Sequence, residues 1–212
     1  MFMRNIIIFW FLLSAAAPGY SQRFTGGISA GVTGSQVDGD KFSGFHKLGI
    51  AFGPFTRTRL NNFMEAKLEL RYSGRGAWGN SGTKENPRIY QLLLNYVELP
   101  VTIEVFFSDK YFIEGGISPS FLLSRKVFDG GGRIPDDKIQ PDFNSSDYNY
   151  LIGLTYLITP KTGFNIRYQY SILPIRRRNI GNYYYGWLAD VLGYREGDYN
   201  NFITLSVYFL LS

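Results

Sequence analysis

Two extended segments joined by a very short turn, over residues 90–124, constrain this chain more than any other feature. The first segment sets apolar residues against polar residues and one proline: Val97, Leu99, Val101, Ile103 and Val105 against Glu98, Pro100, Thr102 and Glu104. After a turn at residues 108–110, the second sets Tyr111, Ile113 and Ile117 against Glu114, Gly116, Ser118 and Ser120. A period of two predicts strands with one apolar and one polar face. The polar face meets water in a soluble sandwich and lines the interior in a membrane barrel.

Residues 1–21 have the pattern of a secretory signal peptide. Arg4 supplies the positive start, residues 6–13 form an unbroken apolar run, and small residues follow in Ala15–Ala17 and Gly19–Ser21. We expect cleavage after Ser21, with Ala17 as the alternative, which leaves residues 22–212 as one barrel domain. A membrane anchor is the competing interpretation, but the apolar run is shorter than the ~20 residues that a spanning helix needs.

Composition removes several classes of function. The 212 residues include no cysteine, which excludes disulfides, thiolate metal sites and a lipid-anchored mature N-terminus. The formal net charge is +5, without the dense basic tract that nucleic-acid binding requires. No apolar run after residue 22 is long enough for a transmembrane helix. We therefore expect no nucleic-acid partner and no cofactor.

The same alternation recurs along the rest of the chain. Six further segments show it: residues 23–34, 45–56, 63–73, 147–159, 164–173 and 201–212. The connections alternate between long polar loops and short turns, the turns being residues 57–62, 108–110 and 159–163. Short periplasmic turns and longer outer loops are typical of outer-membrane barrels. The sequence therefore predicts an all-β, eight-stranded antiparallel up-and-down transmembrane β-barrel in the outer membrane, with both termini periplasmic.

The polar faces of these strands predict a charged lumen. Nine charged residues fall on them and would pair inside a narrow barrel: Lys47, Glu65, Lys67, Glu69, Arg71, Glu98, Glu104, Glu114 and Arg167. An eight-stranded barrel is just wide enough for side chains to fill it. Buried charges must be paired or hydrated, and this near balance of signs allows pairing.

One block of the fourth strand resembles a known family. The stretch Tyr96-Val97-Glu98-Leu99-Pro100-Val101 is similar to a Tyr-x-Glu-Leu/Ile-Pro motif of PorT-like outer-membrane β-barrel proteins of Bacteroidetes. Residues 115–120, the glycine-rich first strand and the apolar last strand also fit this family. The resemblance implies an eight-stranded outer-membrane barrel. It also implies an envelope or secretion-associated role, because the founding member of the family is an accessory of type IX protein secretion.

Few residues suggest chemistry. His46 is the only histidine, and a catalytic histidine would need a carboxylate or serine partner, so an interfacial polar role suits it equally well. Without a second histidine or any cysteine, we predict neither a metal site nor catalytic residues. The triplet Gly130-Gly131-Gly132 opens no helix and precedes no Lys-Ser/Thr pair, so loop flexibility is preferred over phosphate binding.

The last long loop carries two clusters of interest. Arg176, Arg177 and Arg178 would contact lipopolysaccharide phosphates, because guanidinium groups pair well with phosphate oxygens. A solvated loop rim is the alternative. An interaction surface is suggested by clustered aromatic residues, which are Tyr183, Tyr184, Tyr185 and Trp187. Packing within the loop, or contact with the membrane interface, would explain these aromatic residues equally well.

Two classes of function therefore remain. The first is a non-enzymatic barrel that serves a surface or secretion assembly through its loops and turns, with outer-membrane lipid, lipopolysaccharide and envelope or secretion proteins as partners. The second is a small transport or lipid-interacting barrel, including a lipid-modifying enzyme.

Overall fold

The computed structural model describes residues 24–40, 42, 44–177 and 197–211, and the predicted signal peptide, residues 1–21, lies outside them. Strands dominate the described residues, together with one short 3₁₀ helix. The elements in chain order are β1 (Phe24–Asp38), β2 (Lys47–Arg59), β3 (Met64–Glu69), β4 (Arg71–Asn80), β5 (Ile89–Glu98), β6 (Val101–Ser108), β7 (Tyr111–Asp129), β8 (Gly132–Ile134), η1 (Asp136–Lys138), β9 (Ser146–Thr159), β10 (Thr162–Ser171) and β11 (Tyr199–Leu210). No helix among these residues is long and apolar enough to cross a membrane.

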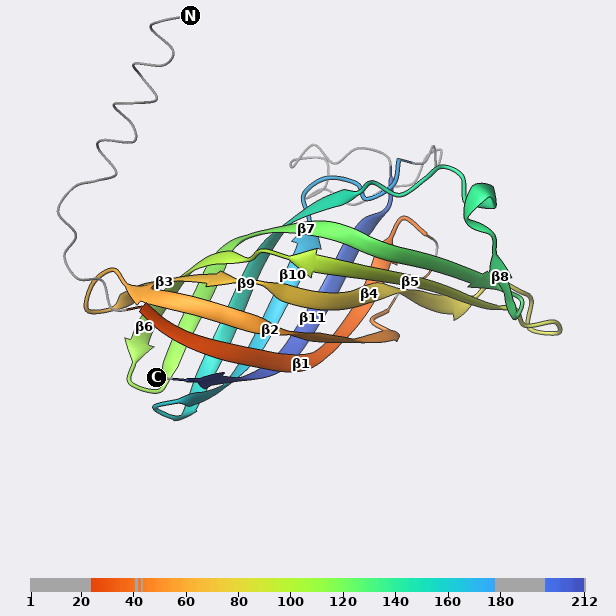
Figure 1. Cartoon of the computed structure of the whole chain (residues 1–212). Coiled ribbons are helices and arrows are strands. Elements are labelled where there is room, and N and C mark those ends of the chain that lie inside the picture. The colour runs from red at the N-terminus through yellow and green to blue at the C-terminus, as the bar shows by residue number, and fades with distance from the viewer. Residues whose placement is uncertain (1–23, 41, 43, 178–196, 212) are drawn as a thin grey trace, which may run out of the picture.

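The strands close into one antiparallel ring (Figure 1). β1 pairs with both β2 and β11, so the first and last strands of the chain are neighbours. β3 and β4 form one wall strand interrupted at Leu70, and β5 and β6 form the next, interrupted at Leu99 and Pro100. Counted in this way the ring has eight strands, as the sequence predicts.

The two ends of the ring differ. At the short-turn end lie three tight connections and both ends of the described chain. Phe24, at the first end, pairs with Thr58 near the end of β2, and Phe209, close to the last end, pairs with Thr162 at the start of β10. At the long-loop end lie the connections from β1 to β2, β4 to β5, β7 to β9 and β10 to β11 (Figure 1). The predicted alternation of long and short connections is therefore present.

Side chains alternate between the two faces of the wall as the sequence predicts. On β9, Ile152 and Leu154 lie exposed on the outside, whereas Asn149 and Thr155 are buried inside. Large apolar side chains are exposed around the whole ring, while the buried side chains of the interior are mainly polar or charged. This arrangement is opposite to that of a soluble protein and suits a barrel whose outer face contacts hydrocarbon.

The strands reach further toward the long-loop end than the sequence suggested. Residues 74–80 were expected to be loop but continue β4, and β7 extends to Asp129 and forms a small hairpin with β8. At the short-turn end, β2 runs to Arg59, where a turn was expected from residue 57. At the long-loop end, pairing with β5 extends β4. Gly74 pairs with Asn95 and Gly76 with Leu93, although glycine weakens strand propensity.

If hydrocarbon contacts the outer face, the cost of a charge there should depend on depth. Replacing Ile152→Lys, near the middle of β9, is expected to destabilise the barrel by about 2–4 kcal/mol, and Ile158→Lys, near its end, by only about 0–1 kcal/mol. The two isoleucines are similarly exposed, at 59% and 57%, so they form a matched pair. Urea unfolding in lipid vesicles measures both, and equal effects would contradict a hydrocarbon-facing wall.

Candidate functional site

The interior near the short-turn end holds a dense group of ion pairs, here named the short-turn cluster. Its members alternate in sign across the lumen: Arg57, Glu65, Lys67, Glu69, Glu104, Glu114 and Arg167. The Lys67 ammonium lies 2.6 Å from Glu104 Oε1 and 2.8 Å from Glu114 Oε2. Arg167 binds Glu114 through two bonds, Nε to Oε1 at 2.9 Å and Nη2 to Oε2 at 3.0 Å. Such two-point pairing fixes the guanidinium plane as well as its charge.

A second group, the mid-barrel cluster, lies further along the lumen and comprises Arg71, Arg75, Glu98 and Asp147. Arg71 donates to Glu98 Oε2 from Nε at 2.9 Å and from Nη2 at 2.6 Å. Arg75 pairs with Glu98 and, at 2.9 Å, with Asp147. The Arg75 guanidinium also lies 4.0 Å from the ring centroid of Phe202 and 4.6 Å from that of Tyr96. Arg75 is therefore held by two carboxylates and two aromatic rings at once.

Polar side chains supply further hydrogen bonds to the carboxylates between the ion pairs. Asp147 Oδ2 accepts from Asn149 Nδ2 at 3.1 Å and from Asn200 Nδ2 at 2.9 Å, in addition to Arg75. In the short-turn cluster, Asn165 donates to Glu114 at 2.8 Å. Buried charges are tolerated when they are paired and hydrogen-bonded, and each charged side chain of the two clusters has at least one oppositely charged partner.

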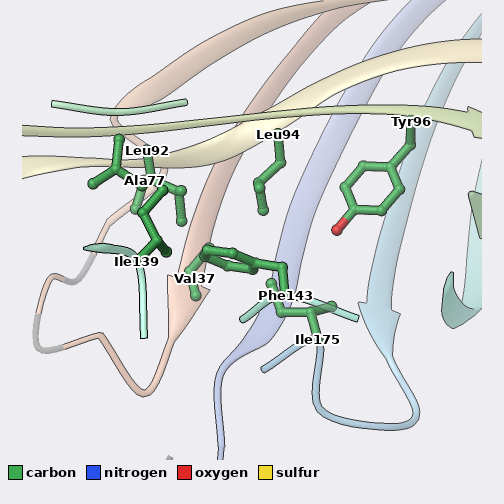
Figure 2. Packing of buried hydrophobic residues seen from close by; sticks show 9 residues of the cluster. Val37, Ala77, Leu92, Leu94, Tyr96, Ile139, Phe143 and Ile175 are labelled. Carbon is green, nitrogen blue, oxygen red and sulfur yellow. The ribbon is translucent and has the colours of Figure 1, made fainter. Parts of the chain in front are cut away.

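Above these clusters the barrel is closed by buried apolar side chains, here named the apolar plug (Figure 2). Its members come from four strands and from two long connections: Val37, Ala77, Leu92, Leu94, Tyr96, Val127, Ile139, Phe143 and Ile175. Figure 2 shows Ile139, Phe143 and Ile175 lying below the side chains that Leu92 and Leu94 project from the strand above them. Parts of the long connections thus fold back over the lumen. The plug lies across the long-loop end of the lumen.

Arg176 is part of this closure. Its guanidinium donates from Nε to Asp198 Oδ2 at 2.6 Å and lies 4.3 Å from the ring centroid of Phe143. Its side chain is only 5% exposed. The prediction that Arg176 contacts lipopolysaccharide is therefore wrong, because its charge is committed to Asp198 inside the protein.

Comparison with known proteins identifies the family. Residues 19–177 match the family model described as outer membrane protein beta-barrel domain. The chain belongs to this family. This family is a broader class than the predicted PorT-like group.

Solved outer-membrane proteins have similar structures. Ail of Yersinia pestis, solved in complex with the heparin analogue sucrose octasulfate, is similar with a TM-score of 0.51 and 13% identity, over 89% of this chain and 99% of that one. Neisserial surface protein A is similar with a TM-score of 0.45 and 12% identity, over 88% and 98% of the two chains. No curated protein sequence matches the chain significantly. The family match places this barrel in the outer membrane.

The structure brings together all of the predicted lumen charges except Lys47. Lys47 is the first residue of β2, at the long-loop end, and its ammonium donates to the carbonyl of Leu48 beside it. Among the described residues it joins no ion pair, so its predicted place in the network is wrong. Its position at the strand end keeps it apart from the two clusters, whose members lie on strands further along the lumen.

Sequence reasoning missed Arg57, Arg75 and Asp147. The first two were assigned to connections, although Arg71, Ser73 and Arg75 continue the alternation of the third wall strand. That continuation was the signal that could have placed Arg75 inside. Asp147 was assigned to a strand, but nothing near it in the sequence indicates its partner. That partner, Arg75, lies on β4, whereas Asp147 lies on β9.

The remaining predicted residues belong to the long connections of the sequence. Arg177 is exposed, whereas Arg178, Tyr183, Tyr184, Tyr185 and Trp187 lie outside the described residues. His46 is exposed, and its ring meets Trp78 edge-on at 6.4 Å between centroids. No group of three or more potential metal-ligating side chains occurs in the described ranges.

Glu114 is the centre of the short-turn cluster, so its removal tests whether the network holds the barrel together. Glu114→Gln keeps the shape but leaves Lys67 and Arg167 without their shared carboxylate. Breaking a buried pair in this way is expected to cost about 3–5 kcal/mol. Chemical unfolding in vesicles measures the loss. Glu85→Gln, at an exposed loop position, is the control, and a similarly small change in both variants would show that the network is dispensable.

Proposed function

We propose that this protein is a non-enzymatic outer-membrane barrel that acts through its loops and does not conduct solutes. The observation that carries the proposal is the filled interior. Two ion-pair clusters and the apolar plug follow one another along the lumen. A barrel of eight strands leaves little space once such side chains are in place. What remains available for recognition is therefore the surface formed by its connections.

The cavities of the described residues support a closed barrel. Beside the short-turn cluster, a cavity of about 20 Å³ is lined by Arg57, Glu104 and Tyr208, among others. This volume holds about one water molecule. A larger hollow of about 490 Å³ lies among the short turns, where Asn61 and Asp109 line it together with the ends of β3 and β6. Its lining includes no residue of the mid-barrel cluster or the plug.

The connections suggest the orientation. We infer that the short turns and both termini face the periplasm and the long connections face the cell exterior, because outer-membrane barrels combine short periplasmic turns with longer outer loops. On this orientation the plug lies under the cell surface. The long connections would then form the surface that meets envelope or extracellular partners.

An envelope or secretion-associated role of the PorT-like kind is the finer form of this proposal. It is supported by the Glu98-Leu99-Pro100 block, on which the resemblance depends, and by a closed barrel that suits a scaffold. Ail, with a similar fold, was solved with a sulfated sugar analogue, which supports recognition by such barrels in general terms. Transport is the competing function, and it would require solutes to pass the apolar plug.

Conductance separates the scaffold from the transporter. In planar bilayers the purified barrel is expected to show no stable channel steps, because ion pairs and the plug occupy the lumen. A large general porin, inserted into the same bilayers, is the control, since its wider barrel keeps an aqueous channel. Reproducible steps that persist in freshly refolded protein would contradict the closed barrel and favour transport.

The proposed lipopolysaccharide contact now depends on Arg177 and Arg178, since Arg176 is buried. The double variant Arg177→Gln and Arg178→Gln is expected to co-purify less lipopolysaccharide, because two phosphate-binding charges are lost. Phosphate and lipid analysis of the purified protein measures this. Arg133→Gln is the control, as Arg133 is exposed on another long connection and is paired with Asp136 at 3.2 Å. Equal lipopolysaccharide content in the double variant and wild type would remove the proposed contact.

A further inference from the structure

Three prolines converge at one level of the barrel wall. Pro54 lies inside β2, Pro119 lies inside β7, and Pro100 stands between β5 and β6. Leu70 N–H donates to the carbonyl of Pro54 at 3.0 Å, and Leu99 N–H donates to that of Pro119 at 2.8 Å. Proline is normally confined to sheet edges and bulges, because it cannot donate to the ladder. A closed ring has no edge, so this row is an unusual feature of a membrane wall.

The prolines leave three carbonyls without their ladder donors. Residues in a hydrogen-bonded antiparallel pair exchange two bonds, and here only one of each two can form. Leu70 and Leu99 donate to prolines that cannot donate back, and Glu69 N–H donates in the same way to Pro100 at 3.0 Å. The ladder is therefore weakened between β2 and the third wall strand, and again on both sides of the fourth. In hydrocarbon such unsatisfied groups are costly, and water is not there to satisfy them.

A notch in the outer wall lies at this weakened region. It has a volume of about 290 Å³ and is lined by Pro54, Phe55, Thr56, Leu68, Glu69, Leu70 and Leu99. Leu68 and Leu70 are exposed on the lipid-facing side, whereas Phe55 and Glu69 are buried and belong to the inner face. The notch is thus lined by strand residues of both kinds, and Glu69, whose side chain lies 3.4 Å from the Lys67 ammonium, belongs to the lumen network on the other face.

We propose that this wall notch binds an acyl chain of an outer-membrane lipid, and specifically a chain that carries a hydroxyl group. The hydrocarbon part fits walls built mainly from proline and leucine, and the notch opens on the face that surrounding lipid already covers. The hydroxyl supplies what a plain acyl chain lacks, one hydrogen-bond donor for a carbonyl of a residue that lines the notch, such as that of Leu70 opposite Pro54. The same chemistry gives a role to the three prolines, whose replacement would complete the ladder.

Photo-crosslinking in the native membrane tests the proposal. A photoreactive p-benzoylphenylalanine is placed at Thr56, in the notch, or at Ile166, which faces lipid on β10. Lipid adducts are then identified by mass spectrometry. The expected result is an enrichment of hydroxylated acyl chains at position 56 over position 166. Adducts of the same composition at both positions, or no adduct at position 56, would overturn the proposal.

Closing the notch provides the second arm. The double variant Pro54→Val and Pro119→Val restores two ladder donors and is expected to abolish the enrichment at position 56. Pro160→Val, in the turn between β9 and β10, is the control and should leave the enrichment unchanged. Heat-dependent gel mobility shows whether each variant is folded. If the double variant does not fold, single Pro54→Val replaces it, because Pro54 lines the notch, and enrichment that persists in a folded variant also overturns the proposal.

Discussion

The closed backbone ladder is the constraint on which the rest of this structure depends. A chain that crosses hydrocarbon must satisfy its own N–H and C=O groups, and only a ring of strands does so without leaving an edge. The pairing of β1 with β11 closes that ring over twelve residue pairs, from Gly27–Leu210 to Asp38–Tyr199. Once the ring is closed, alternate side chains must point into a narrow lumen. The composition of that lumen, not of a conventional core, then decides what the barrel can do.

The lumen is filled by charge because its side chains can neutralise one another at short range. Arg167 reaches from β10 to Glu69 on β3 and Glu114 on β7, and Arg75 reaches from β4 to Asp147 on β9. These bonds cross the barrel and tie together strands that share no ladder. Glycines let the wall approach closely: a Cβ at Gly31 or Gly49 would lie 2.1 or 2.0 Å from a backbone oxygen of the neighbouring strand, and one at Gly153 would lie 2.6 Å from Glu114 Oε1. The polar interior therefore braces the wall while it blocks the lumen.

Sequence alone predicts those parts of this molecule that depend on neighbours along the chain. The alternation of Met64, Ala66 and Leu68 with Glu65, Lys67 and Glu69 gives both the strand and its two faces. What it cannot give depends on pairing between distant segments. Arg75 and Asp147 meet only because β4 and β9 lie across the lumen, and Ile139 and Phe143 join the plug only because their connection folds back over the barrel. Arg176 illustrates the same limit, since its partner Asp198 is 22 residues away.

The row of prolines depends on strand register, which the sequence alone does not give. Each is plain in the sequence, yet their convergence follows from the pairing of Pro54 with Leu70 and of Leu99 with Pro119. The opposite wall, where β10 pairs with β11 and β11 with β1, runs through its ladders without a shift in register. The wall from β2 to β7 therefore lacks three ladder donors that the wall around β11 has. A barrel that is filled along its axis but lacks donors on one side presents its open hydrogen-bonding groups at the wall, and the surroundings there are lipid.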